Sequence, residues 1–116
     1  MSIRIAHQSF ATMEEAQAAV QISGLHCAEL AVPPVENSSH WHQFHAELYV
    51  LDGDLLFTDV ATDTKHSCGP GSHIVVPPRS LHAERSLNGY RIVLGTSVLP
   101  PEFGDPVNKL PSELND

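Results

Sequence analysis

Short apolar runs separated by turn residues dominate the pattern of hydrophobic and polar positions along the chain. These runs lie at residues 25–32, 48–51, 55–60, 74–76 and 90–97. Runs of this length, rich in β-branched and aromatic residues, are typical of strands. Asp52-Gly53-Asp54 and Asn88-Gly89 predict tight hairpin turns between them. The pattern therefore predicts an all-β fold, as an antiparallel barrel or double-sheet jelly roll.

One helix is predicted near the N-terminus. Thr12 and Glu15 have the spacing of a capping box, in which each side chain accepts a hydrogen bond from a backbone amide at the other residue. We expect helical turns over residues 16–21, ended by Ser23-Gly24. Residues 3–10 alternate loosely and predict an edge strand. We assign these elements to the scaffold of the protein.

The most informative stretch is residues 39–47, which contains three histidines and a carboxylate. His40 and His42 are two positions apart, so a strand places both imidazoles on one face. Two imidazoles on one face bind a single divalent metal, and the nearby Glu47 offers an oxygen ligand. The alternative is a solvent-facing, histidine-rich loop that binds nothing. Trp41 and Phe44 favour the metal site, because a solvated loop would not bury aromatic side chains.

A second stretch, residues 69–82, consists of a turn, a short apolar strand, another turn and a lone histidine. With the His40-x-His42 pair, and with Glu47 after four intervening residues, it resembles the cupin family. The positions that match the second cupin motif are Gly71, Pro77 and His82. The resemblance covers about residues 22–98. It implies a double-stranded β-helix, or jelly-roll barrel, as one domain over residues 1–116 with a short N-terminal helix.

The sequence departs from the cupin pattern at three positions. Five residues separate Glu47 from Gly53, where the family has six. Counting back from Gly53 puts Ala46 at the ligand position and turns Glu47 to the other face, unless a one-residue bulge restores it. Arg79 replaces a motif glycine and Ser86 replaces an asparagine. Arg79 is expected either to bind a carboxylate substrate or to be a solvated turn residue.

The resemblance implies that His40, His42, Glu47 and His82 hold one divalent metal, with His45 as the competing fourth ligand. Ligand type alone does not choose among Fe, Mn, Ni, Zn and Cu. Glu47, if it leaves the metal, is also the expected general base. The function expected is a metal-dependent dioxygenase, isomerase or decarboxylase acting on a small organic molecule in the barrel. The alternatives are a module that binds a ligand or metal without turnover, and a barrel without metal that serves as an interaction unit.

Composition limits the classes of partner. The formal charge is −8 with only six lysines and arginines, which argues against nucleic acid and against an anionic membrane surface as partners. No apolar run approaches the length of a membrane span, and we expect a cytoplasmic protein with reduced cysteines. Residues 99–116 form a proline-rich, acidic tail. We expect this tail either to have no fixed position or to dock on its own barrel or on a partner subunit. This tail and the hydrophobic outer strands predict a homodimer.

Overall fold

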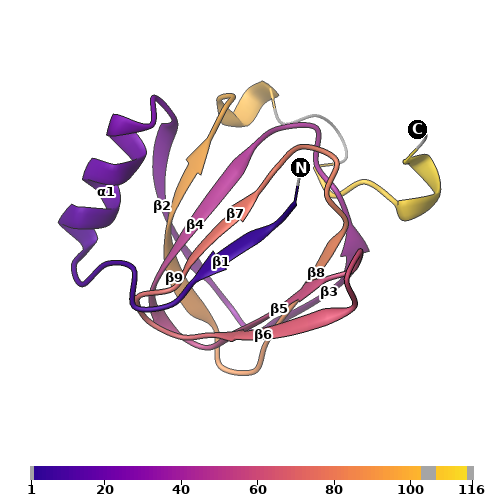
Figure 1. The fold of residues 1–116 in the computed structure, drawn as a ribbon, viewed down its shortest axis with the longest axis horizontal. Helices are drawn as coiled ribbons and strands as arrows, with labels where there is room; N and C mark the ends of the chain where they lie inside the picture. The colour runs from indigo at the N-terminus through magenta and orange to yellow at the C-terminus, as the bar shows by residue number, and fades with distance from the viewer. Residues whose placement is uncertain (1, 103–106, 115–116) are drawn as a thin grey trace.

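Two antiparallel sheets face each other in the computed structural model, which describes residues 2–102 and 107–114 (Figure 1). The larger sheet has the strand order β1-β7-β4-β9-β2 and the smaller has β3-β8-β5-β6. The strands of the larger sheet are β1 Arg4–Ala6, β7 His73–Val76, β4 Ala46–Gly53, β9 Tyr90–Thr96 and β2 His26–Val32. Those of the smaller sheet are β3 Val35–His40, β8 His82–Ser86, β5 Leu55–Asp59 and β6 Thr64–Cys68. This arrangement confirms the predicted all-β jelly roll.

Side-chain alternation along β4 separates the interior of the barrel from its outer face. Ala46, Leu48 and Val50 are buried in the core between the sheets, whereas Tyr49 is buried outside it, beneath the helix. This alternation is what the pleat of a strand requires. The other buried members of the inner core are Phe44, Leu55, Phe57, Cys68, Ile74, Val76, Tyr90 and Ile92.

Helix α1, Met13–Ile22, covers the outer face of the larger sheet (Figure 1). The predicted capping box is present: Glu15 N donates to Thr12 Oγ1 at 3.1 Å, and Thr12 N donates to Glu15 Oε1 at 3.1 Å. Ala16 and Val20 are fully buried against the sheet. The helix starts earlier and ends one residue later than the predicted turns over residues 16–21.

The two predicted hairpin turns are instead corners where the chain passes from one sheet to the other. β4 belongs to the larger sheet and β5 to the smaller, and β8 and β9 are divided in the same way. Gly53 and Gly89 both have positive φ, at +90° and +89°. A Cβ on Gly53 would lie 2.3 Å from the carbonyl oxygen of Gly89. The hairpin predictions were therefore wrong, although the glycines mark tight turns, because local turn chemistry does not specify which sheet the next strand joins.

Residues 107–114 of the tail lie against the barrel on the side opposite α1 (Figure 1). Short 3₁₀ turns form at η1 Pro100–Glu102 and η2 Pro111–Glu113. Between them, Lys109 forms an antiparallel bridge with Trp41. Residues 103–106 and 115–116 of the predicted tail lie outside the described residues. No helix in the described ranges is long and apolar enough to cross a bilayer.

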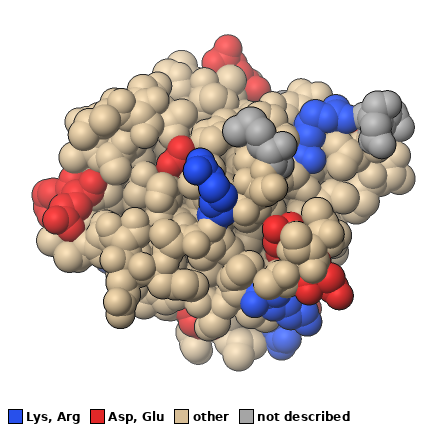
Figure 2. Space-filling model, in the orientation of Figure 1, with Lys and Arg blue, Asp and Glu red and all other residues tan. Residues whose placement is uncertain are grey.

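Basic side chains form no continuous surface on the face shown in Figure 2. Lysine and arginine lie there in small, separate groups, with acidic side chains between and around them. This distribution agrees with the excess of acidic over basic residues in the sequence. It offers no stripe of positive charge on that face for a nucleic acid backbone to follow.

Candidate metal centre

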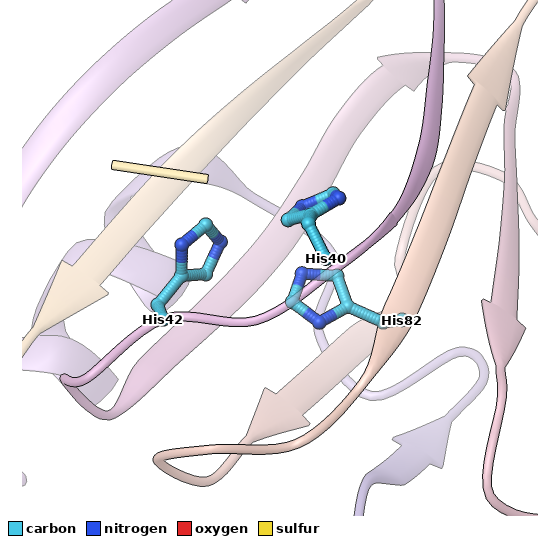
Figure 3. Close-up of side chains that lie close together, drawn as sticks. All are labelled: His40, His42 and His82. Carbon is cyan, nitrogen blue, oxygen red and sulfur yellow. The ribbon is translucent and has the colours of Figure 1, made fainter. Parts of the chain in front are cut away.

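Three histidines from distant parts of the chain meet inside the barrel (Figure 3). His40 ends β3, His82 begins β8, and the two residues pair across these neighbouring strands. His42 lies in the connection between β3 and β4. The ring centroids are 4.3 Å apart for His40 and His82, and 5.1 Å from His42 to each of the others. One ligand atom from each ring lies within 4.8 Å of the others.

Each of these rings is oriented by a backbone carbonyl at its Nδ1 atom. The bonds join His40 Nδ1 to Ser38 O at 2.7 Å, His82 Nδ1 to Ser80 O at 2.8 Å and His42 Nδ1 to Val107 O at 2.8 Å. A carbonyl oxygen only accepts, so Nδ1 carries the proton in all three rings and the neutral ring keeps a lone pair on Nε2. This is the arrangement that second-shell partners impose on metal-binding histidines.

The Nε2 atom of His40 is buried and makes no hydrogen bond to any described residue. Glu84 Oε1 lies 3.2 Å from this nitrogen, but not in the geometry of a hydrogen bond. A buried polar atom without a partner is costly and calls for an explanation. Three converging imidazoles fit a divalent transition metal such as zinc, iron, manganese, nickel or copper.

Glu84 is a functional candidate that the sequence reasoning missed. It lies two residues after His82 on β8, so both side chains face the barrel interior, and its side chain is 13% exposed. Burial favours its neutral form, but contact with His40 and the charges of the three histidines hold its pKa below the usual value. The signal was available, because strand alternation from His82 selects Glu84.

The protonation of the three histidines responds to burial and to Glu84. Burial lowers the pKa of His82 to about 4, with Glu84 opposing this shift. Burial also lowers the pKa of His42. For His40, burial acts in the same direction, but Glu84 and the carbonyl of Ser38 outweigh it and raise the pKa. Burial therefore favours the neutral, ligand-competent form of His42 and His82.

Glu47 and His45 do not join the three histidines. Glu47 Oε2 accepts a hydrogen bond from His45 Nε2 at 2.9 Å, and its Oε1 accepts from His73 Nε2 at 2.7 Å. Tyr49 donates to the same Oε1 at 3.3 Å. Burial opposes ionisation of Glu47, but these bonds from His45 and His73 outweigh it and lower the pKa of Glu47. Burial and the charge of Glu47 raise the pKa of Tyr49 to about 12.

The register of β4 explains this correction to the expected ligand set. Ala46 lines the interior cavity, and Glu47, the next residue, points to the opposite face. The pairing of β4 with β9 does shift between Val50 and Asp52. That irregularity lies beyond Glu47 and does not turn its side chain inward. The five-residue spacing between Glu47 and Gly53 therefore places Glu47 on the outer face, as side-chain alternation requires.

A cavity of about 290 Å³ adjoins the histidines inside the barrel. Its lining residues are Leu30, Val32, Asn37, His42, Phe44, Ala46, Leu48, Phe57, Val76, His82, Glu84, Tyr90, Ile92, Leu94, Val107 and Asn108. A larger hollow of about 990 Å³ lies beside α1, but none of the three histidines lines it. We place the candidate site in the smaller cavity, because ligand sites combine apolar walls with a few converging polar groups.

Residues 107–110, which we name the strap, close one side of this site. Trp41 and Lys109 exchange two backbone hydrogen bonds, of 3.2 and 3.0 Å, and Trp41 Nε1 donates to Leu110 O at 2.8 Å. The guanidinium of Arg79 lies 5.4 Å from the centre of the Trp41 ring, and Lys109 Nζ lies 5.9 Å from it. Arg79 thus packs near the mouth of the barrel and is not part of the cavity lining.

The remaining histidines lie away from the site. His26, near one end of β2, is exposed. His66 on β6 is half-buried and pairs across the sheet with Phe57. His73 belongs to the outer group around Glu47.

No family model matches the chain, and no curated protein matches it. Solved structures do resemble it. The polyketide cyclase RemF from Streptomyces resistomycificus is 24% identical with a TM-score of 0.53, and the match covers 65% of this chain and only 56% of that chain. KdgF from Halomonas sp. is 17% identical with a TM-score of 0.54, covering 85% and 80%. The WlaRB TDP-quinovose 3,4-ketoisomerase from Campylobacter jejuni is 12% identical with a TM-score of 0.55, covering 72% and 68%. Together with the two facing sheets, these likenesses show that the chain has the cupin fold.

Proposed function

We propose that the protein holds one divalent transition metal on the Nε2 atoms of His40, His42 and His82, and acts as a metal-dependent enzyme on a small organic molecule in the barrel. The observation that carries this proposal is the set of three Nδ1–carbonyl bonds, which leaves three Nε2 lone pairs in one place. The buried Nε2 of His40, which makes no hydrogen bond to a described residue and lies 3.2 Å from Glu84 Oε1, is a second supporting observation. The reaction expected is an oxygenation, isomerisation or decarboxylation.

A metal bound here supplies open coordination positions that polarise a carbonyl or enol oxygen of a ligand. The side chains of the protein supply the other functional groups of the site. Glu84 offers the carboxylate that contacts the histidines, and it replaces Glu47 as the proposed oxygen donor and acid–base group. The apolar walls of the cavity exclude water, which strengthens every electrostatic interaction at the site.

A module that binds a ligand without turnover is the second candidate, and one observation favours it. In the described lining of the cavity, the ionisable side chains are His42, His82, Glu84 and Tyr90. Burial raises the pKa of Tyr90 above its usual value. Tyr90 therefore stays protonated at neutral pH and does not act as a general base. Proton transfer would then depend on Glu84 and the histidines, and a site with so few groups also suits plain binding.

The test of the metal proposal is the metal content of protein purified without an affinity tag. We expect close to one equivalent of divalent metal in the wild type after reconstitution, and a large loss in His82→Ala, measured by inductively coupled plasma mass spectrometry. His26→Ala is the matched control, because His26 is exposed and lies outside the site. A wild type that stays free of metal after reconstitution, or a His82→Ala that retains it, refutes the proposal.

Enzyme and binding module are separated by turnover. The iron and manganese forms are incubated with catechols, flavonols and 1,3-diketones, while oxygen uptake and product formation are followed. Conversion that disappears in His82→Ala supports an enzyme. Tight binding of a ligand without conversion favours the module.

We also propose a homodimer. The larger sheet ends at β2, an edge strand paired only with β9 among the described strands. Open sheet edges favour pairing with another chain. Light scattering coupled to size exclusion tests this, and a monomer at high concentration rejects it.

A further inference from the structure

The charge of the side chains that line the cavity beside the three histidines limits which ligands it can hold. Within the ranges that the structure describes, no lysine or arginine lines it. The two cations nearest its mouth in the strap region, Arg79 and Lys109, lie over the ring of Trp41. The polar groups of the lining, apart from His42 and His82, are Asn37, Glu84, Tyr90 and Asn108.

A negatively charged group in this cavity would have no cation to pair with away from the histidines. Burial of an unpaired charge is costly, and the carboxylate of Glu84 adds repulsion. Phosphate and carboxylate ligands are normally held by arginine or lysine. The cavity therefore selects against ligands that carry an anionic group on the part that lies along its walls.

The walls define what the cavity accepts. Leu48, Phe57, Val76, Ile92 and Leu94 present aliphatic and aromatic surface to its interior. Its volume of about 290 Å³ lies just below the lower limit of about 300 Å³ that is usual for small-molecule sites. A cavity of this size and lining accommodates an uncharged molecule about the size of one ring.

We propose that the ligand of this site is an uncharged, apolar molecule about one ring in size, which directs a pair of oxygen atoms at the three histidines. Catechols and 1,3-diketones have this form. The inference rests on the proposed function, because the oxygen pair would bind the metal held by the histidines. It goes further by excluding phosphorylated and carboxylated ligands on the charge of the cavity.

The test compares two probes that share a metal-binding end and differ in charge at the other end. These are 4-methylcatechol and 3,4-dihydroxybenzoate, titrated by calorimetry into the zinc-loaded protein, because zinc undergoes no redox reaction with catechols. We expect the carboxylate to bind at least about tenfold more weakly, equivalent to about 1.4 kcal/mol. His82→Ala, treated with zinc in the same way, is expected to bind neither probe.

A second variant asks whether charge is the cause. Leu30 lines the cavity and is 43% exposed, so Leu30→Lys adds an ammonium group at the rim without opening the core. We expect it to reduce the discrimination between the probes to about threefold or less, whereas Leu30→Met preserves it. Discrimination that is unchanged in Leu30→Lys would overturn the electrostatic basis of the inference.

Zinc content is measured before each titration, so the two proposals fail in different ways. Protein that takes up no zinc refutes the metal site itself. Zinc-loaded protein that binds both probes equally, prefers the carboxylate or binds neither probe refutes the inference about the ligand and leaves the metal site standing.

Discussion

The hydrogen bond from His42 to the strap predicts that the affinity of the proposed metal site depends on a segment 65 residues away in the chain. Lys109→Pro tests this dependence. Proline removes the backbone N–H that Lys109 donates to Trp41 O at 3.0 Å, and it also restricts the backbone of Asn108. We expect the strap to leave the barrel and His42 Nδ1 to lose its carbonyl partner.

The magnitude follows from the contacts. The strap makes four hydrogen bonds to Trp41 and His42, worth about 0.5–1.5 kcal/mol each, or about 2–6 kcal/mol together. Ordering its four residues costs about 1–2 kcal/mol each, or about 4–8 kcal/mol. The Lys109 ammonium over Trp41 adds about 0.5–1 kcal/mol. The terms nearly balance, so loss of the Lys109–Trp41 bond together with the backbone restriction by proline is enough to release the strap, whereas the ammonium of Lys109 is the smaller contribution.

The expected result is a 10- to 100-fold loss of zinc affinity, as for other second-shell partners of metal-binding histidines. Competition with a chromophoric chelator at fixed pH measures it. Lys109→Ala is the matched control, because it removes the ammonium from the Trp41 ring but keeps the N–H, and its zinc affinity should stay within about threefold of wild type. Long-range ¹H–¹⁵N spectra of the metal-free protein report the proton on His42 Nδ1.

Two outcomes would contradict this reasoning. Lys109→Pro with wild-type zinc affinity, despite loss of the His42 Nδ1 proton signal, would mean that the tautomer of His42 does not control binding. Equal losses in Lys109→Pro and Lys109→Ala would assign the effect to the charge of the side chain.

Three further predictions follow from single contacts. Glu84→Gln should weaken zinc binding at least about tenfold, whereas Glu47→Gln should leave it unchanged, measured by the same competition assay. Because the pKa of Glu47 is lowered in the folded state, its contribution, about 1.5–3 kcal/mol, is present near neutrality and is lost as the pH falls through that pKa. The stability gap between wild type and Glu47→Gln in urea melts should therefore close on acidification; a constant gap contradicts this. Gly53→Ala should cost about 3 kcal/mol or more, because its Cβ would meet backbone at 2.3 Å, whereas Gly24→Ala, with no atom within 4 Å, should cost about 1–2 kcal/mol for its positive φ.

The elements that the sequence predicted well are those with local causes. The capping box at Thr12 and Glu15 is present because both of its bonds lie within four residues. The apolar runs at residues 48–51 and 90–97 correctly marked the strands β4 and β9. The convergence of His82 with the other two histidines was expected from the cupin resemblance, which carries three-dimensional information that spacing alone lacks.

The failures concern relations between elements. Turn residues at Gly53 and Gly89 predict where the chain bends, but the sheet that the next strand joins depends on long-range pairing. Val107 O was out of reach for the same reason, since a backbone carbonyl carries no sequence signal and meets His42 only through the fold. Glu84 is different: it was predictable from alternation, and it was overlooked because the motif directed attention to Glu47.

The register of β4 leads to a last prediction, in which the carboxylate is moved from one strand to another. Ala46 faces the cavity at the position where the cupin pattern implies a glutamate, while Glu84 on β8 contacts the histidines from the opposite sheet. We expect Glu84→Ala to weaken zinc binding, and the double variant Ala46→Glu/Glu84→Ala to regain at least about tenfold of the loss, because the 290 Å³ cavity has room for the added side chain. The control is a Glu84→Ala chain that also carries Ala46→Gln, which has nearly the same volume without the charge. The register argument fails if zinc affinity recovers with Ala46→Gln. It also fails if zinc affinity does not recover with Ala46→Glu in a protein that melts as the wild type does, because the inward side of β4 would then not reach the metal.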